Sequence, residues 1–205
     1  MMFIPECFKI KDQDTIYELI EQHSFATLIS QLDGKPYATH LPLVLHTDEQ
    51  ALYGHIAQEN KQWIEGEKQQ VLAIFQGPHC YISPTYYETT KAVPTWDYVS
   101  VHVYGKMEII KEKDIILQSL TELVNKYEKL ESPYNYQDLE PRMIDGMIGE
   151  LVAFKIKISK IEAQGKLSQN HPAERQELII KHLERNSDQN DKQVAALMRK
   201  NLLNQ

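Results

Sequence analysis

Residues 76–105 read QGPHCYISPTYYETTKAVPTWDYVSVHVYG, and the rest of the chain is organised around this stretch. An apolar run over 71–75 precedes it and has the length and composition of a buried strand. Alternating residues over 98–110 predict a second, longer strand. The segment between them carries three prolines and four large aromatic residues: Pro78, Pro84, Pro94, Tyr81, Tyr86, Tyr87 and Trp96. Because proline fixes φ and aromatic side chains have large rigid surfaces, we expect a stiff loop that packs against other groups.

Two interpretations of this loop stay open. In the first, the loop only covers the sheet beneath it. In the second, it forms a wall of a ligand pocket or of a subunit interface. A loop of this length inside a compact domain is usually a lid or a binding loop, which favours the second interpretation.

Length and composition indicate a soluble globular protein. The 205 residues suffice for one substantial core and a small appendage, and 42% hydrophobic and 25% charged residues are ordinary values. No apolar run approaches the roughly 20 residues that a membrane-spanning helix needs. The first residues lack the basic and apolar regions of a signal peptide, and two cysteines make no disulfide framework. We expect no membrane association and a cytoplasmic location.

The net charge of −7 is distributed unevenly. Residues 155–205 hold ten Lys/Arg and six Asp/Glu, whereas residues 1–154 hold 12 and 23. An acidic body is a poor surface for duplex DNA, whose binding depends on neutralising phosphates. If DNA is a partner, residues 155–205 are the expected contact. The alternative is a solvated helical surface of mixed charge.

The first half of the chain predicts an antiparallel sheet. Strands over 25–31 and 36–45 flank Asp33-Gly34, a dipeptide typical of tight hairpin turns. Pro42 predicts an edge position or a bulge, since proline cannot donate to a strand ladder. A third strand over 51–57 and a helical turn over 58–66 follow. With the two strands beside the proline-rich loop, these strands predict a meander that often closes into a small barrel.

Helical periodicity predicts the remaining elements. Helices are expected over 13–23, 111–130 and 140–148, a half-exposed strand over 151–161, and a helix pair over 172–185 and 189–203. The fold class is therefore α+β, mainly antiparallel β, with peripheral helices and a C-terminal helix pair. We divide the chain into a barrel-like domain, 1–165, and a helical appendage, 166–205.

None of the strongest catalytic or metal-binding signatures is present. The eight histidines are scattered, and a lone histidine on a strand is more often structural than a ligand. His79 and Cys80 are adjacent, but neighbouring residues of a strand point to opposite faces, so they do not make a catalytic pair. We predict no catalytic residue and no metal site.

One clustering argument remains. The residues concerned lie on the second and third predicted strands, in the turn that follows and beyond the proline-rich loop: His40, His55, Asn60, Lys61, Trp63, Trp96 and His102. In a small barrel these positions converge on one cleft with polar tips, two indoles and a lysine. Such a cleft suits a flat anionic ligand better than a metal ion. The alternative is a subunit interface, where aromatic residues are enriched.

Four stretches together resemble one family. They are FATLISQLDGKPYATHLPLVL (25–45), LYGHIAQENKQW (52–63), VLAIFQGPHCYISPTYYETTKAVPTWDYVSVHVYG (71–105) and KLSQN (166–170). From near its first residues to about Asn170 the chain is similar to the PaiB-type FMN-binding negative transcriptional regulators. The resemblance implies an FMN-binding split β-barrel, similar to that of pyridoxamine-phosphate oxidases. It also implies a homodimer with flavin sites at the subunit boundary, and repression of sporulation and extracellular protease production.

The resemblance also implies where FMN would bind. Its phosphate would lie near the end of the third strand and the following turn, at His55, Asn60, Lys61 and Gln62, where a helix starting near residue 58 would offer backbone N–H groups. This chain has one lysine there, whereas the oxidases use a more basic set. The flavin ring would lie near Thr39 and His40, with Trp96 or His102 contributed by a partner chain. Lys166, Ser168 and Gln169 match the KLSQN motif without an assigned role.

Three functional hypotheses follow. The first is a flavin-binding repressor that acts on transcription directly or through a partner. The second is a flavin- or haem-dependent oxidoreductase, because split barrels are mostly enzyme scaffolds and a fold does not fix a function. The third is a small-molecule sensor that does not hold FMN tightly.

Overall fold

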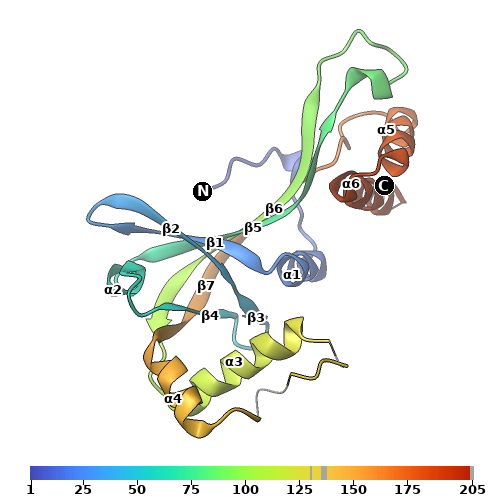
Figure 1. Cartoon of the computed structure of the whole chain (residues 1–205). Coiled ribbons are helices and arrows are strands. Elements are labelled where there is room, and N and C mark those ends of the chain that lie inside the picture. Colours follow the sequence, from blue (N-terminus) through green and yellow to red (C-terminus); the bar gives the residue numbers. More distant parts are fainter. Residues whose placement is uncertain (130, 135–137, 204–205) are drawn as a thin grey trace. The chain divides into compact units, whose positions relative to one another are not determined.

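The computed structural model describes residues 1–129, 131–134 and 138–203. Seven strands occur in these residues (Figure 1): β1 (Phe25–Leu32), β2 (Lys35–Pro42), β3 (Val44–His46), β4 (Ala51–Ala57), β5 (Gln70–Ile82), β6 (Thr95–Ile109) and β7 (Leu151–Lys166). The α-helices are α1 (Gln13–Gln22), α2 (Gln62–Gly66), α3 (Lys113–Tyr127), α4 (Pro141–Gly149), α5 (Ala173–Arg185) and α6 (Gln189–Leu203). Two short 3-10 helices, η1 (Glu6–Phe8) and η2 (Pro84–Tyr86), complete the described elements.

The strands form one sheet in the order β2-β1-β5-β6-β7-β4-β3, and the pairs β1–β2, β1–β5, β3–β4 and β4–β7 are antiparallel. The predicted α+β class with mainly antiparallel strands is therefore confirmed. The sheet does not close into a barrel, because no pairing among the described residues joins its end strands β2 and β3. The expected meander is wrong as well: residues 51–57 pair with 151–157 instead of with the strand beside the proline-rich loop.

The chain divides into two compact units. We call residues 20–75 and 102–161 the body unit, and residues 1–19, 76–101 and 162–205 the terminal unit. Strands β5, β6 and β7 each contribute residues to both units. The helix pair α5–α6 thus shares a unit with part of the proline-rich stretch, and the predicted boundary at 165/166 stays a prediction.

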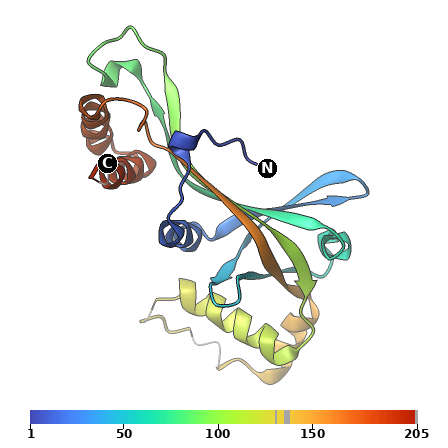
Figure 2. The ribbon, with the colours of Figure 1, turned by 180° about the vertical axis from the view of Figure 1, so that it is seen from behind.

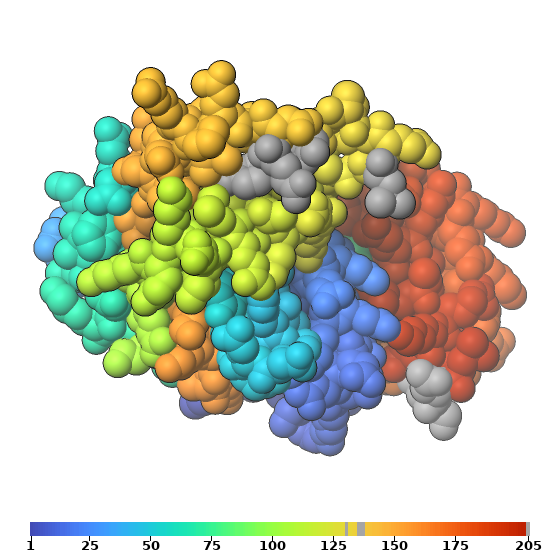
Figure 3. Space-filling model, turned by 90° about the horizontal axis from the view of Figure 1, so that it is seen from below, coloured from blue at the N-terminus to red at the C-terminus, as the bar shows by residue number. Residues whose placement is uncertain are grey.

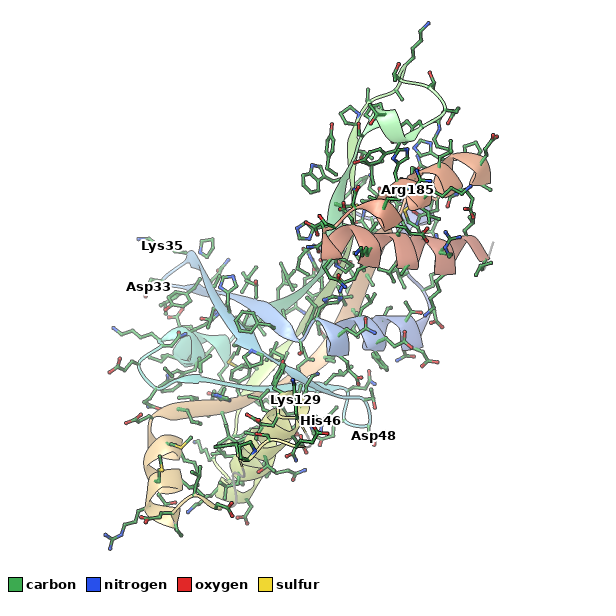
Figure 4. All side chains as sticks on the ribbon, turned by 45° about the vertical axis from the view of Figure 1, so that its right-hand side comes forward. Asp33, Lys35, His46, Asp48, Lys129 and Arg185 are labelled. Atoms are coloured by element: carbon green, nitrogen blue, oxygen red, sulfur yellow. The ribbon has the colours of Figure 1, made fainter. Side chains whose placement is uncertain are left out.

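In the body unit, the hairpin β1–β2 forms as the Asp-Gly dipeptide predicts. Asp33 and Gly34 have φ angles of 52° and 70°, and Figure 4 shows Asp33 at the tip. Pro42 ends β2, an edge strand, as expected. The expected strand over 36–45 is nevertheless two strands, because Leu43 leaves the hairpin and its N–H donates to the Ser24 carbonyl at 2.9 Å.

Helices α3 and α4 pack on β4 and β7 (Figures 1 and 2). Ala51 and Tyr53 from β4 meet Ile116 from α3 and Ala153 from β7 in one buried cluster. At the edge of this layer, His46 Nε2 lies 2.8 Å from Glu122 Oε2 of α3. Figure 3 shows this contact region from outside, with the turn after β3 (cyan) against α3 (yellow-green). The arrangement fixes the β3–β4 turn to α3.

In the terminal unit, the strands are longer than the sequence indicates. β5 continues to Ile82 and β6 begins at Thr95, so the expected long loop covers only residues 83–94. Buried Cys80 and Ile82 alternate with exposed His79 and Tyr81, which is the pattern of a strand. Pro78 is tolerated because β1 pairs only with Leu72–Ile74 of β5, so no bond to β1 is lost there.

Helices α5 and α6 lie side by side along this two-stranded segment in both views (Figures 1 and 2). Their shared core is closed, with Ile179, Ile180, Leu183, Val194 and Met198 all fully buried. The His79 N–H donates to Asn190 Oδ1 of α6 at 3.4 Å. The helix pair expected from periodicity is therefore confirmed, with α5 starting at Ala173.

Three further expectations change in extent. The helical turn over 58–66 contains a helix only from Gln62 to Gly66, and β7 runs to Lys166 instead of ending at 161. α3 ends at Tyr127, and Leu130, the last residue of the expected helix, lies outside the described residues. No helix in the described ranges is long and apolar enough to cross a membrane.

Candidate functional site

The eleven predicted site residues are divided between the two units. Eight belong to the body unit: Thr39, His40, His55, Asn60, Lys61, Gln62, Trp63 and His102. Three belong to the terminal unit: Trp96, Lys166 and Gln169. The two groups are therefore considered separately.

Three body-unit residues are joined by hydrogen bonds. Asn60 Nδ2 donates to Thr39 Oγ1 at 2.9 Å, and Asn60 Oδ1 accepts from the Gln62 N–H at 3.0 Å. These bonds fix the turn after β4 to the middle of β2. The predicted proximity of the second strand and the turn after the third is thus confirmed for these residues.

Gln62 anchors this turn. Its side chain is fully buried, and Nε2 lies near the Leu28 carbonyl, Ser30 Oγ and the Tyr37 carbonyl at 3.1, 3.0 and 3.4 Å. A buried amide that bonds to the β1–β2 hairpin has a structural role, whereas the family resemblance implied that Gln62 binds the phosphate. Its Oε1 is buried without a hydrogen-bond partner among the described residues.

The other body-unit residues are dispersed. His40 is exposed on β2, and no hydrogen bond or ring contact among the described residues joins it to His55. His55 is partly buried, and burial lowers its pKa. Trp63 Nε1 donates to the Gln58 carbonyl at 3.3 Å. The His102 ring is 6.5 Å from that of Tyr104 on the same strand.

The residues near the end of β4 fit FMN in part. The hydroxyl of Thr39, the amide of Asn60 and the exposed ammonium of Lys61 are suitable partners for polar flavin atoms and for a phosphate. Lys61 is the lysine that this chain would offer the phosphate, and burial lowers the pKa of the nearby His55. The expected helix N-terminus does not serve it, since α2 spans five residues and the Gln62 N–H is already bonded to Asn60.

The KLSQN motif has a structural role that the sequence did not reveal. Lys166 Nζ donates to Thr95 Oγ1 and to the Trp96 carbonyl, both at 2.6 Å, and lies 3.3 Å from Asp97 Oδ1. Ser168 Oγ donates to Asp97 Oδ2 at 2.6 Å. The Asp97 carboxylate is fully buried, and burial raises its pKa against the lowering effects of Ser168 and Lys166. We call Asp97, Lys166 and Ser168 the buried carboxylate cluster.

Gln169 closes the turn after β7. Its Oε1 accepts from the Leu167 N–H at 2.7 Å, and its Nε2 donates to the Gly165 carbonyl at 2.6 Å. Ser168 between them has a φ of 58°, a conformation that non-glycine residues seldom adopt. Gln169 and the Ser168–Asp97 bond thus maintain this backbone.

Trp96 lies on the exposed face of the β5–β6 segment. It is 55% exposed, and its ring is within 6.3 Å of that of His79 and 6.0 Å of that of Tyr81. The adjacent Cys80 faces inward, as expected for neighbouring strand residues. Burial, reinforced by Asp191, Asp97 and Asp188, raises the pKa of the Cys80 thiol to about 12.

Five cavities stand out in the described residues, and none is lined by His40, His55 or Trp96. Among the eleven predicted residues, Lys166 and Gln169 line cavities, and both cavities lie in the terminal unit. None of these five cavities corresponds to the predicted cleft around His40, His55 and Trp96.

Solved structures share this fold. A flavocytochrome from Azotobacter vinelandii superposes with a TM-score of 0.62 at 14% identity, covering 77% of this chain and 69% of its own. A FAD and heme binding protein from Mycobacterium smegmatis gives a TM-score of 0.60 at 13% identity, covering 77% and 73%. This chain thus shares the split-barrel fold of these proteins, with a sheet that is not closed.

Sequence comparison then identifies the family. The model described as "Putative FMN-binding domain" matches residues 2–160. "Protease synthase and sporulation protein PAI 2" of Bacillus subtilis (strain 168) is 39% identical over 208 aligned positions, which cover 100% of both chains. This chain therefore belongs to the PaiB-type family of FMN-binding-domain proteins, and FMN is the cofactor that the family implies.

Proposed function

We propose that this protein is a homodimeric, cytoplasmic FMN-binding regulator that represses genes for sporulation and extracellular protease production. The observation that carries the proposal is the 39% identity to the Bacillus subtilis PAI 2 protein over the full length of both chains. The fold by itself supports flavin binding and not regulation, because one fold serves many functions.

FMN binding is proposed at the end of β4, where Thr39, Asn60 and Lys61 supply a hydroxyl, an amide and an ammonium. The bound flavin would supply redox chemistry or an absorbing ring, while these residues hold its polar atoms. Native mass spectrometry of freshly purified protein, with and without added FMN, tests this. The expected species is a dimer with one FMN per chain, and a monomer without flavin would contradict the proposal.

One sheet face supports the homodimer. Thr27 pairs with Ile74 and Ile29 pairs with Leu72, and directly paired residues share a face. All four are only partly buried, whereas Leu28 and Ala73 on the opposite face are fully buried. A partly covered aliphatic sheet face is the kind of surface that subunits cover in obligate dimers.

Direct contact with DNA is proposed through the helix pair. Many of its cations are paired: Arg199 Nη2 lies 2.8 Å from Glu184 Oε1, and Lys200 Nζ lies 3.4 Å from Glu18 Oε2. In the described part of the pair, the exposed cations without an ion pair are Lys181, Arg185 and Lys192. Three cations predict weak binding with a log–log salt slope of about −3.

Fluorescence anisotropy with promoter DNA over a salt series measures that slope. Replacing all three cations by glutamine should abolish the salt-dependent binding. No binding at low salt would show that regulation acts through another molecule.

Regulation itself is tested by complementation. A Bacillus subtilis strain that lacks its PAI 2 protein would be supplied with this chain, and extracellular protease and spore counts would be measured. The expected result is a return of both quantities to the parental level. Protease and spore counts that stay at the level of the deletion strain would contradict the regulatory role.

The structural neighbours favour a second candidate, a flavin- or haem-dependent oxidoreductase. An absorbance spectrum of the purified protein, followed by NAD(P)H addition, distinguishes it from the first. Bleaching of bound flavin with turnover would favour the enzyme, and a stable spectrum would favour the regulator.

A further inference from the structure

The terminal unit holds a cavity that the proposed FMN site does not use. It has a volume of about 470 Å³, within the range of small-molecule sites. Its walls come from the loop after η2, the start of β6, the KLSQN turn and the first turn of α5. Chain segments far apart in sequence therefore form one enclosure.

The lining combines basic and apolar side chains. Lys166, His171 and Arg175 line it together with Tyr87 and Val93, and no Asp or Glu is among the lining residues. The negative charges that balance the two cations lie outside the lining: Asp97 beside Lys166 and Glu88 beside Arg175. A ligand inside the cavity would thus meet no carboxylate of the wall.

Lys166 is not available to a ligand. An ammonium has three N–H groups, and Lys166 Nζ already has three acceptors: Thr95 Oγ1, the Trp96 carbonyl and Asp97 Oδ1. Lys166 therefore shapes the wall and fixes the buried carboxylate cluster, and the charge contact with a ligand falls to Arg175.

Arg175 is held in place and keeps donors free. Its guanidinium lies 4.9 Å from the centre of the Tyr87 ring, which His171 approaches at 5.8 Å. Nε and Nη2 donate to Glu88, while Nη1 has no hydrogen bond among the described residues. The Glu88 side chain is 46% exposed. Because the Glu88 side chain reaches solvent and Nη1 is unused, an incoming anion can compete with Glu88 for Arg175.

From this geometry we propose that the cavity binds a small organic anion, with its carboxylate or phosphate on Arg175 and its apolar body against Tyr87 and Val93. Glu88 is then an internal competitor that occupies Arg175 when the ligand is absent. The inference does not depend on FMN binding or on regulation, because it concerns a different group of residues.

Ligand-observed NMR titration of the full chain with benzoate, phenyl phosphate and the neutral isostere benzamide tests the proposal. Ligands of about ten heavy atoms predict a Kd of roughly 1 mM for the two anions. Benzamide should bind at least about fivefold more weakly, since its amide has no charge to offer Arg175. No binding of either anion at roughly tenfold that concentration would overturn the proposal.

Two variants should change the affinity for benzoate in opposite directions. Arg175→Gln should weaken benzoate binding about tenfold, and Glu88→Gln should strengthen it about threefold because the competitor is gone. Arg185→Gln, which replaces an exposed arginine at the other end of α5 (Figure 4), is the matched control and should leave benzoate binding unchanged.

Equal effects of Arg175→Gln and Arg185→Gln, or weaker binding in Glu88→Gln, would overturn the proposal. Thermal unfolding of each variant checks that it is folded. If Arg175→Gln does not fold, the benzoate affinity of Glu88→Gln tests the proposal.

FMN is added in a last experiment. Displacement of benzoate by stoichiometric FMN would assign this cavity to the flavin and overturn the inference, whereas unchanged benzoate binding in FMN-loaded protein would support it.

Discussion

Asp97 lies in an environment that its residue type does not predict. A carboxylate that is fully buried needs compensation, which Lys166 and Ser168 provide. Removing one partner of a buried pair leaves the other charge uncompensated, and this usually destabilises a protein strongly. Through these contacts the KLSQN motif stabilises the terminal unit.

Lys166→Met should lower the free energy of unfolding by about 3 kcal/mol. For a chain of this size that corresponds to a fall in Tm of roughly 6–12 °C. Chemical denaturation measures the difference, and Lys181→Met, which removes an exposed lysine without an ion pair among the described residues, is the control. Equal stability of the two variants would show that Lys166 does not support Asp97.

The same cluster predicts a pH dependence. Burial raises the pKa of Asp97 in the folded state, so its contribution to stability is largest at low pH and is lost as pH rises through that pKa. Lys166 lowers the pKa of Asp97. Replacing Lys166 with methionine therefore raises this pKa further, so the loss of stability continues to higher pH. The stability difference between wild type and Lys166→Met should therefore be smaller at pH 5 than at pH 8. A difference that grows on acidification would contradict this assignment.

The two cysteines should differ in reactivity. Cys7 is exposed, whereas Cys80 is buried and its pKa is raised to about 12, which leaves almost no thiolate near neutral pH. A disulfide reagent at pH 8 should modify one thiol quickly and the second only after denaturation. Cys7→Ser should remove the fast phase and Cys80→Ser should not. Two fast thiols in the native protein would contradict the buried placement.

At the scale of elements, the close approach of β6 and β7 depends on a residue without a side chain. A Cβ on Gly105 would collide with the Lys157 carbonyl oxygen, and with Ile156 Cγ2 at 2.5 Å. The backbone of a central strand cannot move aside easily. Gly105 is therefore required by packing and not by its own φ angle, which is not positive.

Gly105→Ala should destabilise the body unit by about 2–3 kcal/mol. Gly146→Ala is the matched control, because Gly146 lies inside α4 and no atom of the described residues lies within 4 Å of an added Cβ. Alanine there should stabilise the helix by about 0.5–1 kcal/mol. Thermal unfolding measures the change in stability of both variants, which should be negative for Gly105→Ala and positive for Gly146→Ala. An unchanged stability of Gly105→Ala would contradict the close packing of β6 against β7.

Local patterns predicted most elements of the chain. Asp33-Gly34 defined the hairpin, and apolar periodicity located α5 and α6 within one residue. The length of β5 was missed at Pro78, since proline normally ends a strand, whereas the break between β2 and β3 after Pro42 was not predicted. Which neighbour lies on each side of a proline is a tertiary property, and at Pro78 it makes the residue acceptable.

At the scale of the whole molecule, the aliphatic face of β1 and β5 should hold two subunits together. Ile74→Glu places a charge on this face and should convert a dimer into a monomer that stays folded, as measured by light scattering after size-exclusion chromatography. Leu203→Glu, at an exposed position near the end of α6, should leave the dimer intact. A dimer that survives Ile74→Glu would place the interface elsewhere.

By itself the sequence determined the family, the antiparallel class and the helix pair, because these depend on local periodicity and on long distinctive motifs. Only the tertiary structure decided that Gln62 and Lys166 serve buried neighbours instead of a ligand, and that Arg175 lines a cavity. The physical reason is that the role of a polar side chain depends on its burial and partners. Those partners come from distant parts of the chain, which no local pattern specifies.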